Sequence, residues 1–340
     1  MSFVTGLCCK ECGARYPIEP RYVCEYDFGA LEVVYDYEAI RRSISREIIE
    51  KRPGNLWRYR EFLPIENTPR TGFHSGWTPL IKAERLAKRW GVKELYFKDD
   101  SVNRPTLSYK DRVVSVALSK AIEFGFDTVA CASTGNLGNA VAAHAASAGL
   151  KPYIFVPADI EPGKILCTLI FGAHVVLVEG NYDDVNRLCA EIADKYGWAF
   201  VNVNLRPFYT EGAKTHGFEI VEQLGWRLPG SVVLPVAGGT ILPKVCKAFE
   251  EFREAGLAEG ELPAIFAAQA TGCAPVARAY KAGLSVIQPV KPNTIAKSIA
   301  IGNPADGYDV LDVLQRTGGA AEDADDEEII EAVKLLAESE

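Results

Sequence analysis

The feature that most constrains the fold is a regular alternation of short apolar runs with helix-length segments along most of the chain. Runs rich in β-branched or apolar residues predict strands at 94–98, 128–132, 151–156, 174–178, 199–203, 231–236 and 264–269. Between most of them, apolar residues recur at roughly 3.6-residue spacing, which predicts helices over 109–125, 136–148, 161–172, 182–197, 211–225 and 240–254. This alternation predicts an α/β fold with mostly parallel sheets and helices on both faces.

Charge and composition exclude several classes of partner. The chain has 340 residues, of which 48% are hydrophobic and 24% are charged, so it can bury the core of two domains or of one large domain with a subdomain. The net charge of the chain is −8. Residues 321–340 hold nine acids and one lysine (1 − 9 = −8), so the net charge of residues 1–320 is zero. We therefore expect no nucleic-acid or membrane partner. Nine cysteines without a signal peptide favour a cytoplasmic protein with reduced thiols.

An unusual lysine follows the first predicted strand. Parallel α/β sheets bind ligands where strands end and helices begin. In "SYKDR" (108–112), Ser108 and Asp111 have capping-box spacing, so Ser108 is the predicted N-cap and Lys110 lies in the first helical turn. A cation is disfavoured there by about 0.3–1 kcal/mol. A lysine kept in such a place suits Schiff-base chemistry with an aldehyde, although an ordinary solvated lysine is the alternative.

Two further turns predict binding of anions. In "AGGTIL" (237–242), Gly238 and Gly239 let the backbone approach a phosphate at a helix start, although a plain tight turn remains the alternative. In "STGNLGN" (133–139), hydroxyls and N–H groups could hold a carboxylate, while Asn136 could simply cap the helix. An aldehyde-binding lysine together with a phosphate cradle suggests pyridoxal 5'-phosphate as cofactor.

Five stretches resemble the fold-type II pyridoxal-phosphate enzymes, whose fold is like that of the tryptophan synthase β subunit. They are "KDDSVNRPTLSYKDR" (98–112), "ASTGNLGNAVAAHAASAGL" (132–150), "NLRPFYTEGAKTHGFEI" (204–220), "PVAGGTILPKV" (235–245) and "SIAIGNPADG" (298–307). The stretches at 204–220 and 298–307 narrow the resemblance to the threonine synthase family. Such an enzyme converts O-phospho-L-homoserine and water to L-threonine and phosphate in threonine biosynthesis.

The resemblance implies roles for particular residues. Lys110 would hold the cofactor covalently and move protons, and Asn136 would hydrogen-bond the phenolic oxygen of the cofactor. The cofactor phosphate would lie on Ala237, Gly238, Gly239, Thr240 and Ile241. The substrate would be held by Ser133, Thr134, Gly135, Asn202, Arg206 and Lys214, with Lys214 as the rival of Arg206 for the substrate phosphate.

The resemblance also implies a domain division and leaves alternatives of function. We expect an N-terminal arm over 1–35 and a catalytic core over 36–340, with a smaller α/β subdomain at roughly 110–205. Asp325 to Glu328 should begin a final helix. Family members continue beyond this helix, so we expect the C-terminal portion of the catalytic core to be missing and the activity to be poor. A serine/threonine dehydratase-like lyase and a catalytically silent binding module are the alternatives. A homodimer is a further expectation.

The N-terminal cysteines resemble half of a zinc ribbon. Cys9 and Cys12 form a C-x-x-C pair, and Cys24 begins a second half in which Asp27 stands where a fourth cysteine is expected. Cys8 could substitute. Because a closed structural zinc site normally has four nitrogen or sulfur ligands, we predict an N-terminal β-arm with a vestigial loop and no metal.

Overall fold

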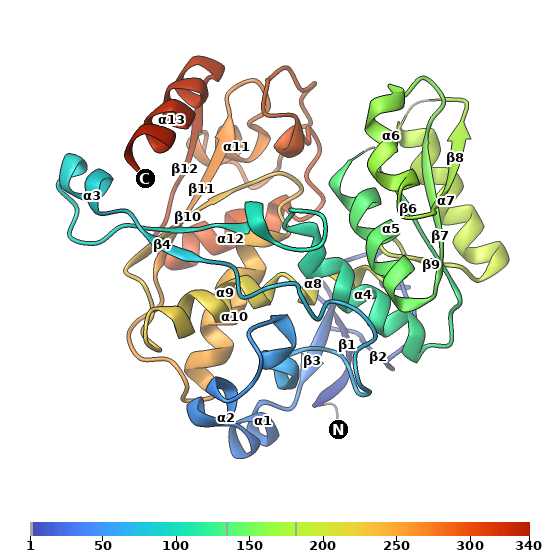
Figure 1. Ribbon diagram of the computed structural model, residues 1–340, viewed down its shortest axis with the longest axis horizontal. Coiled ribbons are helices and arrows are strands. Elements are labelled where there is room, and N and C mark those ends of the chain that lie inside the picture. The colour runs from blue at the N-terminus through green and yellow to red at the C-terminus, as the bar shows by residue number, and fades with distance from the viewer. Residues whose placement is uncertain (1–2, 134, 181) are drawn as a thin grey trace. The chain divides into compact units, whose positions relative to one another are not determined.

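The computed structural model describes residues 3–133, 135–180 and 182–340 (Figure 1). The chain divides into two compact units, Met1–Thr78 with Asp100–Thr215, and Pro79–Asp99 with His216–Glu340. The predicted arm and the predicted α/β subdomain both fall in the first unit. Each unit has its own parallel sheet, as the alternation predicts.

The first unit is built around a four-stranded parallel sheet in the order β8-β7-β6-β9. The strands are β6 (Thr128–Ala132), β7 (Lys151–Pro157), β8 (His174–Val178) and β9 (Ala199–Phe200). The connecting helices are α4 (Lys110–Glu123), α5 (Asn136–Ala148), α6 (Pro162–Leu169) and α7 (Tyr182–Tyr196). All five residues of β6 are buried, as expected for a central strand covered on both faces. The core beside it includes Phe155, Val185 and Phe200.

The N-terminal part of the first unit is an antiparallel sheet followed by short helices. Its strands, in the order β2-β1-β3, are β1 (Val4–Cys9), β2 (Arg15–Tyr16) and β3 (Leu31–Tyr35). The helical segments α1 (Tyr37–Ser43), α2 (Arg46–Glu50) and η1 (Leu56–Phe62) follow, and α8 (Arg206–Glu211) closes the unit. β2 has only two residues, which is too short for an apolar alternation that would predict a strand.

The second unit contains a three-stranded parallel sheet in the order β10-β11-β12. Its strands are β10 (Ser231–Pro235), β11 (Ala264–Ala270) and β12 (Ala321–Ala324). Its helical segments are α3 (Glu84–Trp90), α9 (Lys214–Gln223, whose first two residues fall in the first unit), α10 (Ile241–Glu254), α11 (Pro275–Lys281), η3 (Lys297–Ile299), α12 (Gly307–Thr317) and α13 (Asp326–Ser339). The rings of Phe218 and Phe252 stack at 4.4 Å in its core.

Three predicted elements differ from the structure. The run at 94–98 forms β5 (Tyr96–Lys98), which pairs antiparallel with β4 (Leu80–Lys82) and does not join a parallel sheet. The run at 199–203 is a strand only at β9, because Asn204 accepts the Phe200 N–H at 2.8 Å and turns the chain. The helix predicted over 211–225 corresponds to α9, which begins at Lys214, because Glu211 ends the preceding helix α8 and Gly212 and Ala213 separate the two.

Candidate active site

Lys110 is the first residue of α4, so the prediction that it lies in the first helical turn is confirmed. The predicted cap differs in detail. The N-cap residue is Tyr109, and the Ser108 hydroxyl accepts the Lys110 N–H at 3.2 Å. No capping box forms, because the Asp111 carboxylate accepts instead from the N–H and hydroxyl of Thr106 (3.0 and 2.9 Å).

The Lys110 ammonium has a specific partner on α8. Lys110 Nζ donates to the Tyr209 hydroxyl at 3.0 Å and lies 5.7 Å from the centre of that ring. Tyr209 is buried and lies two residues before the segment "EGAKT" (211–215), 99 residues after Lys110 in the chain. Lys110 itself is only half-buried, so its amine remains accessible to a ligand while Tyr209 orients it.

Arg112 anchors the start of α4 from one side. This fully buried guanidinium makes a bidentate ion pair with Asp100 (2.7 and 2.8 Å). It also donates to the hydroxyls of Thr78 (3.0 Å) and Thr215 (3.1 Å). Because a bidentate guanidinium–carboxylate pair has a fixed planar geometry, this network holds the Lys110 turn in place.

Asp111 anchors the same turn from the other side. His144 of α5 contacts Asp111 Oδ1 through Nε2 at 3.1 Å and Thr71 through Nδ1 at 2.8 Å. His144 thus links Asp111 to Thr71 through its two ring nitrogens. His144, Asp111 and Thr71 are all buried, so the half-buried Lys110 is followed by two buried, anchored residues, Asp111 and Arg112.

The loop after β6 opens directly into α5. The Ser133 N–H donates to Phe155 O of β7 at 3.2 Å, and its hydroxyl accepts the Gly135 N–H at 3.3 Å. Gly135 is the N-cap of α5 and Asn136 its first residue, with an exposed side chain. Thr134 lies outside the described residues. Upstream in β6, burial raises the pKa of the Cys131 thiol, so this neighbouring cysteine is not a thiolate nucleophile.

The segment after β9 lies at the same sheet edge as this loop. β9 pairs parallel with β6 through Val129↔Ala199 and Ala130↔Phe200, so Asn202 and Ser133 both follow the carboxyl ends of neighbouring strands. Among side chains of the described residues, Asn202 Oδ1 is one of a few buried polar atoms without a hydrogen-bond partner. Such an atom points to a ligand. Arg206, the first residue of α8, is half-buried.

Lys214 has a different setting from the other predicted substrate ligands. Its side chain is fully buried and pairs with Glu211 at 2.7 Å. The ammonium lies 4.1 Å from the centre of the Tyr35 ring, and the Tyr35 hydroxyl donates to Glu211 at 2.7 Å. Its prediction as a substrate ligand remains untested, but these contacts give it a structural use.

In the second unit, the loop between β10 and α10 has the form of an anion cradle. Within the described part of the chain, the N–H groups of Ala237, Gly238, Gly239 and Thr240 donate to no acceptor. They precede Ile241, the first residue of α10, where the helix dipole favours negative charge.

The two glycines of this cradle have different reasons to be glycine. Gly239 has φ +94°, and a Cβ there would lie 2.7 Å from the backbone of Asp306. Gly238 has no such constraint, since a Cβ would meet only Ile301, at 3.7 Å. The loop is held by Asp306, whose N–H donates to Gly238 O at 2.9 Å and whose carboxylate accepts the Thr240 hydroxyl at 2.5 Å. A Cβ at Gly238 would therefore make only an ordinary contact within the protein.

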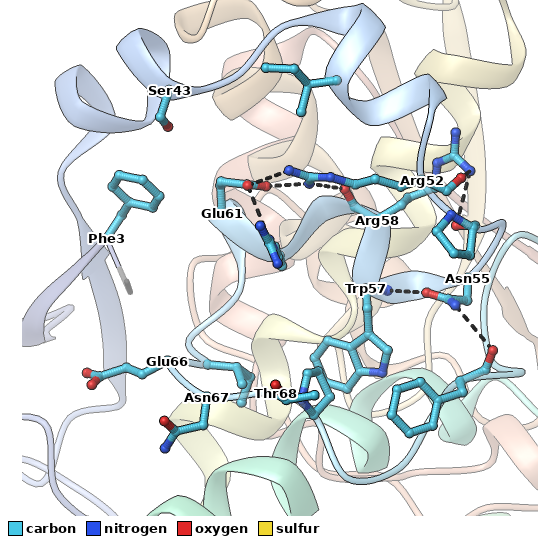
Figure 2. Close-up of a pocket in the computed structure, with 16 residues that line it drawn as sticks. Phe3, Ser43, Arg52, Asn55, Trp57, Arg58, Glu61, Glu66, Asn67 and Thr68 are labelled. Atoms are coloured by element: carbon cyan, nitrogen blue, oxygen red, sulfur yellow. Dashed lines mark hydrogen bonds and ion pairs between the residues drawn. The ribbon is translucent and has the colours of Figure 1, made fainter.

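A cavity of about 800 Å³ lies elsewhere in the first unit, lined by residues between 3 and 73. Figure 2 shows the bidentate pair of Arg52 and Glu61 in its wall (2.7 and 2.6 Å), and Asn55 accepting the Trp57 N–H at 3.0 Å. None of the predicted site residues lines this cavity.

Several residues of these networks were not predicted. Tyr209, His144, Thr71 and Asp306 are single polar residues in ordinary helix or loop contexts, and their partners lie 33 to 99 residues away in sequence. Arg112 and Asp111 did carry a signal, because "KDR" places three consecutive charges at the start of a predicted helix.

Within the residues that the structure describes, no helix is both long and apolar enough to cross a membrane.

Comparison with known proteins gives a consistent picture. Residues 72–340 match the model of a family described as "Pyridoxal-phosphate dependent enzyme". The chain is 39% identical to a threonine synthase of Methanocaldococcus jannaschii and 40% identical to one of Methanosarcina acetivorans; each match covers 98% of this chain and 82% of the relative. A threonine synthase of Halalkalibacterium halodurans is 38% identical over 84% of this chain and 78% of its own.

Solved structures share the fold at lower identity. Maize serine racemase superposes with a TM-score of 0.63 at 21% identity, over 77% of each chain. A threonine deaminase whose source is given as "T.th." superposes with a TM-score of 0.62 at 24% identity, over 76% of this chain and 80% of that one. The expected fold class is therefore confirmed.

Proposed function

The chain belongs to the pyridoxal-phosphate-dependent enzymes, and from this premise we propose that it acts as a threonine synthase on O-phospho-L-homoserine and water. The observation that carries the proposal is the match of 98% of the chain to proteins of that name. The local geometry supports it, because a half-buried lysine begins a helix and is anchored by buried charges on both sides.

Three groups of residues are our candidates for holding the cofactor. The Lys110 amine is the group that would hold its aldehyde, Asn136 would face its phenolic oxygen, and the N–H groups of 237–241 would receive its phosphate. When bound, pyridoxal phosphate supplies the electron sink for negative charge that develops on the substrate's carbons. Tyr209 orients the Lys110 amine, which moves protons between those carbons.

The substrate would lie against the first unit's sheet edge. The substrate carboxylate would accept from the Ser133–Gly135 loop, with Thr134 as a further donor by prediction. Asn202 and Arg206 remain the candidates for the substrate phosphate. The Asn202 side chain suits this because its buried oxygen lacks a partner, and a rotation of the amide would present Nδ2 as a donor there.

The direct test is a product assay on the purified chain with added cofactor. We expect phosphate and threonine to form in equal amounts from O-phosphohomoserine, with no 2-oxobutyrate formed from threonine. The reverse pattern would favour the dehydratase-like lyase, and no turnover of either substrate would refute both enzymatic functions. Borohydride reduction and peptide mapping should place the pyridoxyl label on Lys110; a label on another lysine would overturn the assignment.

Gly238 provides a separate test of the phosphate cradle. Gly238→Ala has room in the protein itself, because its Cβ would make only an ordinary contact with Ile301, so a loss of cofactor in a variant at this position is expected to come from crowding of the ligand; Gly238→Val crowds it further. Gly239→Val would not distinguish the two causes, because its side chain would meet the Asp306 backbone. Thr240→Ser keeps the hydroxyl bonded to Asp306 and is the matched control. Equal cofactor content in Gly238→Val and Thr240→Ser would refute the cradle.

The broader setting also remains a proposal. We place the activity in threonine biosynthesis in the cytoplasm, and the homodimer stays a prediction. Size-exclusion chromatography with light scattering measures the oligomeric state directly.

A further inference from the structure

The N-terminal cysteines converge with an aspartate at one point of the first unit. The Sγ atoms of Cys9, Cys12 and Cys24 and a carboxylate oxygen of Asp27 all lie within 4.8 Å of one another. Cys9 and Cys24 are buried, whereas Cys12 and Asp27 are exposed. This convergence differs from the expectation of a vestigial loop, because residues from both ends of a 19-residue stretch point their ligand atoms at a common centre.

The distances suit a tetrahedral metal. A Zn–S bond of about 2.3 Å gives a tetrahedral sulfur–sulfur edge of about 3.8 Å, and a Zn–O bond of about 2.0 Å gives a mixed edge of about 3.5 Å. The Sγ atoms of Cys12 and Cys24 are 3.6 Å apart, and Cys9 Sγ lies 3.3 Å from Asp27 Oδ1. A disulfide needs about 2.05 Å between its sulfurs, and all of these cysteines are free.

The surroundings hold the ligands in place. Gly29 donates its N–H to Asp27 Oδ1 at 2.8 Å, and the Tyr16 hydroxyl lies 3.0 Å from Cys24 Sγ. A Cβ at Gly29 would lie 2.9 Å from both Cys9 Sγ and Asp27 Oδ1, so glycine is needed for these two ligands to meet. Hydrogen bonds to ligand atoms from outside the ligand set are the usual support of a metal site.

We propose that Cys9, Cys12, Cys24 and Asp27 bind one Zn²⁺ ion in a closed, structural site. Three thiolates select a borderline-soft ion over Mg²⁺ or Ca²⁺, and four protein ligands leave no open position for substrate. Cys9 ends β1 and pairs with Leu31 at the start of β3, so the ion would tie the intervening loop to the sheet.

Cys8 provides a matched control for this site. It is adjacent to Cys9 in sequence, but its thiol contacts the carbonyl groups of Cys9 and Gly13, each at 3.5 Å, and it is not part of the cluster. Cys8→Ser should therefore leave zinc binding unchanged, whereas Cys24→Ser should weaken it at least tenfold. Asp27→Asn should also weaken binding, and Asp27→Cys should restore it.

The experiment uses the full chain, purified under reducing conditions without chelators and reconstituted with ZnCl₂. Elemental analysis and competition with a chromogenic chelator measure stoichiometry and affinity, and hydrogen exchange follows the amides of residues 9–30. We expect one zinc ion per wild-type chain and faster exchange after its removal. Absence of stoichiometric zinc after reconstitution, a Cys12–Cys24 disulfide in the fresh protein, or equal affinity in Cys8→Ser and Cys24→Ser would overturn the proposal. Unchanged affinity in Asp27→Asn would remove the carboxylate from the ligand set.

Discussion

Replacing Lys214 by methionine tests whether this buried lysine is structural or binds substrate. Lys214 and Glu211 are fully buried and 2.7 Å apart. Lys214→Met keeps most of the side-chain volume but removes the ammonium that pairs with Glu211. Removing one partner of a buried ion pair costs about 3–5 kcal/mol, because the remaining charge stays desolvated. Tyr35 still donates to Glu211, so we expect the lower part of this range.

The cost can be measured as a change in melting temperature. For a unit of this size, 1 kcal/mol corresponds to roughly 2–4 °C, so a loss of about 3 kcal/mol should lower the melting temperature of Lys214→Met by about 6–12 °C relative to wild type. The double variant Lys214→Met/Glu211→Gln removes both charges and keeps an acceptor for Tyr35; it should recover most of the loss. Lys151→Met, which breaks an exposed pair with Asp127 in the same unit, should leave the melting temperature unchanged.

Two results would refute this reasoning. If Lys214→Met melts like wild type and raises the KM for O-phosphohomoserine, the ammonium serves the substrate and its pairing with Glu211 contributes little. If the double variant is no more stable than the single one, the stranded carboxylate is not the source of the loss. Calorimetry of the cofactor-loaded protein, with initial-rate kinetics on the same samples, measures both quantities.

Further predictions concern acid stability, catalysis and helix capping. Burial alone would raise the pKa of the Glu61 carboxyl, but hydrogen bonding and charge from Arg52 hold it below its ordinary value of 4.5. The ionised Glu61 therefore stabilises the fold fully above pH 4.5. This stabilisation is lost as the pH falls through the lower pKa of the folded state. Glu61→Gln should therefore be less stable at neutral pH and lose less stability on acid titration; parallel titration curves would contradict this. Tyr209→Phe should keep the cofactor on Lys110 but slow turnover roughly 2- to 10-fold, because it removes one hydrogen bond worth about 0.5–1.5 kcal/mol. An unchanged kcat would exclude a positioning role for Tyr209. Asp325→Ala removes the capping box of α13 and should cost about 1 kcal/mol, seen as faster hydrogen exchange in the first turn of that helix but not in β6.

Elements whose signals are local could be predicted from the amino-acid sequence. β6, β8 and α5 match the predicted ranges 128–132, 174–178 and 136–148 residue for residue. Their runs are apolar, bounded by turn residues and repeated with a period that depends only on neighbouring positions. The start of α13 at Asp326 was also predictable, because a cap is read from three or four consecutive residues. The position of Lys110 follows from the same local rule.

The side chains that support those positions could not be predicted in this way, because they come from distant parts of the chain. β12 reads "AEDA", with no strand pattern of its own, and is a strand because Ala267–Ala270 of β11 supply its hydrogen bonds. Tyr209 reaches Lys110 across 99 residues, and Asp306 reaches Thr240 across 66. These contacts are formed by the packing of elements far apart in sequence, and so no local pattern encodes them.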